Sequence, residues 1–167
     1  MSRRSLACLF AALALAGIGC GSGDDASTSG TADSMGSSGP PSSAQFAVEA
    51  TSLCDEARRA YLIAAPEALL EMQGSADGQS RQELEAKVIQ TVLAPSLQGK
   101  VDKVRALEIP KGDEKQVEEI LGAIEEVAKE ARTEPAKFLY EQTHFKHPFA
   151  EARRLATAYG IGHCGRA

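Results

Sequence analysis

Three histidines near the C-terminus are the side chains in this 167-residue sequence best suited to chemistry. His144 and His147 lie three positions apart and would share one face of a helix, and His163 follows beside Cys164. Imidazole nitrogens with a nearby carboxylate could hold zinc or copper. Against this, Cys164 cannot bind a metal once it is oxidised, and His147 precedes Pro148, which places it at a helix boundary. We therefore predict no metal or other cofactor, and keep metal or small-ligand binding through these three histidines as the alternative function.

No arrangement typical of a catalytic site is found in the sequence. Neighbouring glutamates such as Glu118 with Glu119 diverge around a helix, so they make poor acid–base pairs. Most serines lie before residue 44, and none of the later ones belongs to a nucleophile motif. The 23 acidic and 18 basic residues give a net charge of -5, whereas nucleic-acid binders usually carry a basic stripe. We predict a protein that is not an enzyme and binds no nucleic acid.

The first 19 residues have the pattern of an export signal. Arg3 and Arg4 precede an apolar run from Leu6 to Ile18, which is shorter than the roughly 20 residues of a membrane-spanning helix. Ordinary signal peptidase would cleave after the small-x-small sequence Ala14-Leu15-Ala16 and release a soluble protein that begins at Gly17.

The end of this segment offers a second cleavage mode. Its sequence, Ala16-Gly17-Ile18-Gly19-Cys20, resembles the lipobox of bacterial lipoproteins. In that family cleavage falls just before the cysteine, whose thiol is diacylated. Gly19 fits the pattern, whereas Gly17 stands where the family usually carries leucine. The resemblance implies lipidation at Cys20 and an extracytoplasmic protein anchored to a bacterial cell membrane; a secreted soluble protein is the alternative.

A Gly/Ser-rich segment follows Cys20. Residues 21–43 include eight Ser and five Gly and cannot form a core. Such a chain behaves as a flexible coil about 27 Å from end to end, which suits a tether between a lipid anchor and a folded body. We therefore divide the chain into a signal peptide (1–19), a lipidated cysteine with a disordered tether (20–43) and a folded domain (44–167). Removal of the signal changes the net charge from -5 to -7, because it takes away two arginines and no acid.

Two of the four cysteines remain for a disulfide. Cys8 lies inside the signal, and the lipobox resemblance assigns Cys20 to a lipid. In an oxidising compartment the remaining pair has one possible connectivity. We predict a Cys54–Cys164 disulfide that joins the first helix of the domain to its last residues. Two free buried thiols are the alternative.

From residue 44 onward the apolar residues recur with helical periodicity, and no stretch alternates as a strand would. We expect a first helix over residues 44–65, broken or restarted at Pro66, with a short continuation to residue 73. A capping box of Ser80 and Glu83 begins the second helix, which we expect Pro95 to kink or divide.

The third helix has the clearest apolar face in the chain, formed by Val117, Ile120, Leu121, Ile124, Val127 and Ala131. We expect Asp113 and Gln116 to cap its start in the same manner as Ser80 and Glu83. A last helix would begin near Pro148 and end at Gly160 with a left-handed cap and a hydrophobic contact from Ile161. About four antiparallel helices predict an all-α, small up-and-down bundle.

The whole pattern resembles small exported proteins of high-GC bacteria, many of them uncharacterised lipoproteins. In this chain the residues that carry the resemblance are Cys54, Leu107, Ile109, Pro110, Ala156, Tyr159, Gly160 and Cys164. The resemblance implies a compartment and a fold and supplies no activity. We therefore predict an exported, lipid-anchored and non-catalytic module that binds an unknown envelope protein or small ligand.

Overall fold

The computed structural model describes residues 40–75, 78–144 and 147–167, and within them every regular element is helical. The predicted signal, Cys20 and most of the predicted tether lie outside the described residues. The elements in chain order are α1 (Ser43–Ser75), α2 (Arg81–Val88), the π-helical turn η1 (Ile89–Leu93), α3 (Ala94–Arg105), α4 (Glu114–Thr133), α5 (Pro135–Thr143) and α6 (Ala150–Tyr159). The all-α prediction is confirmed. No described helix is long and apolar enough to cross a membrane.

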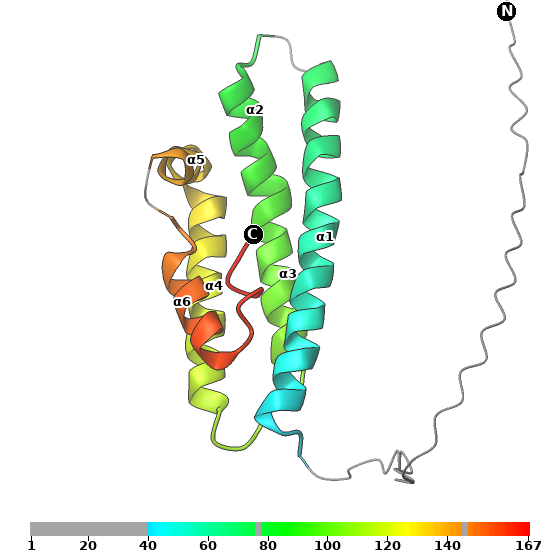
Figure 1. The fold of residues 1–167 in the computed structure, drawn as a ribbon. Coiled ribbons are helices and arrows are strands. Elements are labelled where there is room, and N and C mark those ends of the chain that lie inside the picture. The colour runs from blue at the N-terminus through cyan, green and yellow to red at the C-terminus, as the bar shows by residue number, and fades with distance from the viewer. Residues whose placement is uncertain (1–39, 76–77, 145–146) are drawn as a thin grey trace, which may run out of the picture. The chain divides into compact units, whose positions relative to one another are not determined.

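The helices form an up-and-down bundle (Figure 1). Helix α1, the continuous rod α2–η1–α3 and helix α4 alternate in direction, α6 lies alongside α4, and α5 is seen end-on because it runs across one end of the bundle (Figure 1). Helix α3 packs against both α1 and α4, and α6 packs against α4. The predicted bundle is confirmed, with its fourth helix divided by the turn that contains Pro148.

The predicted break at Pro66 is wrong, because α1 continues through that residue to Ser75. Proline has no N–H, so the carbonyl of Leu62 loses its helical partner. Leu62 is 54% exposed, and water can therefore satisfy this carbonyl. A proline on the solvent side of a helix costs less than one whose freed carbonyl is buried.

Pro95 is accommodated without a break. The π-helical turn η1 lies just before it, and the N–H of Ala94 bonds to the carbonyl of Ile89, five residues back. Within this wider turn Ile89 and Leu93 are buried, while Thr91 is exposed.

Local signals elsewhere are borne out. All six residues of the predicted apolar face on α4 are buried. Ser80 and Glu83 form the predicted capping box. At the end of α6, Gly160 has φ 97°, and the N–H of Ile161 bonds to the carbonyl of Ala156 at 2.9 Å.

Candidate functional site

The predicted disulfide is present and lies in the core. Cys54 in α1 and Cys164 near the C-terminus are bonded, with 5.0 Å between their Cα atoms and 110 residues between them in sequence. Both residues are buried. The bond holds the last residues of the chain against α1, as expected from the sequence.

Lys100 in α3 is a buried lysine that the sequence analysis did not single out. Only 2% of it is exposed, and its Nζ donates a hydrogen bond of 2.5 Å to the carbonyl of Arg166. Burial lowers the pKa of Lys100 to about 8, the charge of Arg58 acts in the same direction, and Asp55 opposes both. The burial of Lys100 could have been predicted from its spacing. It lies three residues after Leu97 and four before Val104, on the same buried stripe of the helix.

This low pKa predicts that the free energy of unfolding rises with pH. The folded chain releases the Lys100 proton near pH 8, whereas the unfolded chain keeps it up to the ordinary value of 10.5. Between these values the unfolded state binds more protons, so stability increases with pH. We expect a gain of about 2 kcal/mol from pH 7 to pH 9.5, measured by urea unfolding at each pH.

Lys100→Met is the control for this measurement, because it keeps the length of the side chain and removes the ionisable group. Its stability should vary by much less over the same range. An equal rise in Lys100→Met would show that another group causes the pH dependence.

The last residues of the chain, which the disulfide and Lys100 hold, also pack against the backbone of α6. A Cβ added at Gly165 would lie 2.6 Å from the backbone nitrogen of Arg153 and 2.7 Å from the carbonyl carbon of Ala152. Only glycine permits this approach. Residues 164–167, which we call the tail, are thus held by α1 through the disulfide, by α3 through Lys100 and by α6 through Gly165.

The three candidate histidines have separate surroundings. His163 lies beside the disulfide, with its Nδ1 2.7 Å from the Oδ1 of Asp55. His144 stacks on Tyr140 with ring centroids 4.1 Å apart, and its Nδ1 lies 2.8 Å from the Oγ1 of Thr143. His147 lies in the turn before α6 and lines a small pocket beside the tail. Within residues 40–75, 78–144 and 147–167 no three His, Cys, Asp or Glu side chains form a group that could hold a metal.

Asp113 lies at the N-cap of α4, but its side chain makes no capping bond, so the predicted capping box with Gln116 is wrong. Its Oδ2 accepts hydrogen bonds from the hydroxyls of Ser43 at 2.6 Å and Tyr159 at 2.7 Å. These two bonds lower the pKa of Asp113, while burial and the Asp113 carboxylate raise the pKa of Tyr159 to about 12. The carboxylate therefore joins the start of α1, the start of α4 and the end of α6, which is a structural role.

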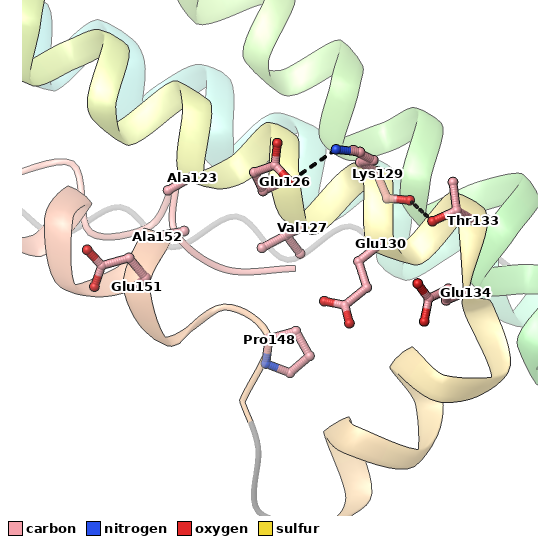
Figure 2. A pocket seen from close by; sticks show the side chains of 10 residues that line it. All are labelled: Ala123, Glu126, Val127, Lys129, Glu130, Thr133, Glu134, Pro148, Glu151 and Ala152. Carbon is pink, nitrogen blue, oxygen red and sulfur yellow. Dashed lines mark hydrogen bonds and ion pairs between the residues drawn. The ribbon is translucent and has the colours of Figure 1, made fainter.

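A groove of about 500 Å³ runs between α4 and α6 (Figure 2). Its lining is rich in glutamate, and each glutamate has a basic partner among the described residues. The pairs are Glu126 with Lys129, Glu130 and Glu134 with Lys137, and Glu151 with Arg154. Because these carboxylates are already paired, we assign no ligand to this groove.

No protein-family model, curated protein or solved structure matches this chain. The family resemblance drawn from the sequence therefore remains a prediction.

Proposed function

We propose that this protein is an exported lipoprotein whose disulfide-bonded helical bundle serves as a non-catalytic binding module at the bacterial envelope. The observation that carries the proposal is the Cys54–Cys164 disulfide. Structural disulfides persist in oxidising compartments and are rare in the cytosol. A buried disulfide thus supports export, and the lipobox-like sequence that ends at Cys20 supports lipid anchoring.

A binding role is favoured by the contacts of the polar side chains. His163 is paired with Asp55, and Asp113 holds Ser43 and Tyr159 together. Through these contacts both side chains join separate segments of the fold, which is a structural role. A folded body on the tether predicted from the Gly/Ser-rich sequence suits capture of a ligand or partner near the membrane.

Anchoring predicts that Cys20→Ala moves the protein from the membrane fraction to the soluble fraction. Two acyl chains give stable membrane attachment, and the substitution removes the thiol that would carry them. The measurement is fractionation of cells expressing the full chain, with immunoblotting and intact-mass analysis.

Cys8→Ala is the matched control, because that cysteine belongs to the predicted signal and would be removed on export. It should leave the protein in the membrane fraction. Membrane association of Cys20→Ala equal to that of the native chain would contradict the anchoring proposal.

A further inference from the structure

A small pocket lies where the tail passes the start of α6, and we call it the tail pocket. Its volume is about 170 Å³, and it is lined by the end of α5, the turn before α6, the first residues of α6 and the tail. Three of its lining side chains carry nitrogen donors: His147, Arg153 and Arg166. No aspartate or glutamate side chain lines it, so the one carboxylate among its lining residues is the α-carboxylate of Ala167.

The two arginines have no charged partner within the described part of the chain. Neither Arg153 nor Arg166 forms an ion pair there. The adjacent Arg154, which does not line the pocket, is bonded to Glu151 at 2.6 and 2.8 Å. With no carboxylate side chain bonded to them, both guanidinium groups keep their N–H donors available to a ligand.

The backbone beside these arginines is fixed before any ligand arrives. Cys164 is bonded to Cys54, Gly165 packs on the α6 backbone at Arg153, and Lys100 holds the carbonyl of Arg166. A site whose backbone is already in place loses less entropy when a ligand binds. The aromatic wall is fixed too, since Phe149 packs edge-on against the buried Phe138 with ring centroids 6.0 Å apart.

Charge, donor geometry and size together identify the class of ligand. Guanidinium groups present a fork of N–H donors that matches the oxygens of phosphate. The first residues of α6 also line the pocket, which adds the positive end of a helix dipole. A volume of 170 Å³ equals that of about six water molecules, which is room for one phosphate with a short substituent. We propose that the tail pocket binds a phosphate group.

This inference rests on the proposed binding role and names its ligand chemistry. Near an envelope membrane the phosphate could belong to a phospholipid head group or to a soluble phosphate. Both sources present the same oxyanion to Arg153 and Arg166.

The test uses the full chain, labelled with ¹⁵N and purified in dodecyl maltoside. Inorganic phosphate is titrated while the Nε–Hε resonances of Arg153 and Arg166 are followed. We expect saturable shifts of both, and an affinity about tenfold weaker in Arg153→Ala, since a charge-assisted hydrogen bond is lost. Arg166→Ala should weaken binding similarly and keep the tail in place, because Lys100 bonds to the backbone carbonyl of Arg166. Arg154→Ala is the matched control and should bind phosphate like the native chain.

Two further probes distinguish a lipid phosphate from a soluble one, and phosphate from a carboxylate. Displacement of phosphate by micelles that contain phosphatidylglycerol would identify a lipid head group as the ligand, and undisturbed phosphate binding would identify a soluble one. Acetate, with two oxygens and one charge, should bind more weakly than phosphate.

The proposal is overturned if neither inorganic phosphate nor phosphatidylglycerol gives saturable shifts. It is also overturned if acetate binds as tightly as phosphate, or if Arg154→Ala weakens binding as much as Arg153→Ala does. Failure of the anchoring proposal would be seen separately, as a Cys20→Ala protein that stays in the membrane, and would not alter the phosphate titration.

Discussion

Exchange of Cys54 and Cys164 together for alanine should lower the free energy of unfolding by about 4 kcal/mol. The disulfide closes a loop of 110 residues, which restricts the unfolded chain far more than a short loop would. Its loss also loosens the tail, which is then held by the bond from Lys100, the contact of Gly165 with α6 and the packing of Ala167 on the core. Urea unfolding of the native and variant chains, at equal pH and without reductant, measures the difference.

Reductant supplies the control for this experiment. It should lower the unfolding midpoint of the native chain and leave the midpoint of the double variant unchanged, because that variant has no bond between α1 and the tail to break. Mass analysis of alkylated protein checks that the native bond was formed. A native chain whose midpoint does not respond to complete reduction would contradict the prediction.

The disulfide should also be coupled to the titration of Lys100. This lysine is buried beneath the tail, and its bond to the carbonyl of Arg166 joins the two. If loss of the bond to Cys54 loosens the tail, water reaches the Lys100 amine and its pKa moves back toward the ordinary value. The pH dependence of stability described above should then be smaller in the double cysteine variant.

Short-range signals in the sequence were sufficient for most of the fold. The apolar face of α4 repeats with the period of a helix, and Ser80 with Glu83 forms a capping box within four residues. A cap at Gly160 likewise depends only on neighbours in the chain. The disulfide was predictable for a different reason, because one pair of cysteines remained once Cys8 and Cys20 were assigned.

The errors arose where a residue's surroundings come from distant parts of the chain. A carboxylate at an N-cap normally bonds to its own helix, but Asp113 bonds to hydroxyls that are 70 and 46 residues away. Pro66 was expected to end α1, yet it lies on an exposed side of the helix, where water can satisfy the freed carbonyl. The local sequence shows neither the hydrogen-bond partners of Asp113 nor the exposure of Pro66.

The tail pocket could not be predicted for the same reason. Arg153 and Arg166 line one pocket because the disulfide holds the last residues of the chain and Gly165 lets them approach α6. The sequence does carry one indication. Arg153 has no acidic residue three or four positions away, since Glu151 lies only two positions before it, whereas Arg154 lies three residues after Glu151. Helical spacing therefore indicated which of the two arginines would be left unpaired.

Gly165→Ala should destabilise the domain by about 3 kcal/mol, as expected when a buried contact is overfilled. The added Cβ would lie within 2.7 Å of backbone atoms of Ala152 and Arg153, and backbone atoms cannot rotate away as a side chain can. The tail must therefore move off α6, which strains the segment held by Cys164 and lengthens the bond from Lys100 to the carbonyl of Arg166. Urea unfolding measures the loss of stability, and the alkaline pH dependence reports whether Lys100 has become more hydrated.

Gly122→Ala is the matched control, since it makes the same chemical change inside α4, where an added Cβ meets nothing within 4 Å. Alanine is a better helix former than glycine, so this variant should be more stable by about 0.5–1 kcal/mol. The same Gly→Ala change would then destabilise the domain at residue 165 and stabilise it at residue 122. This difference would show that the close approach of the tail to α6, and not alanine itself, causes the loss of stability. If Gly165→Ala were as stable as the native chain, the tail could not be packed against α6, and the pocket between Arg153 and Arg166 would lose its fixed backbone.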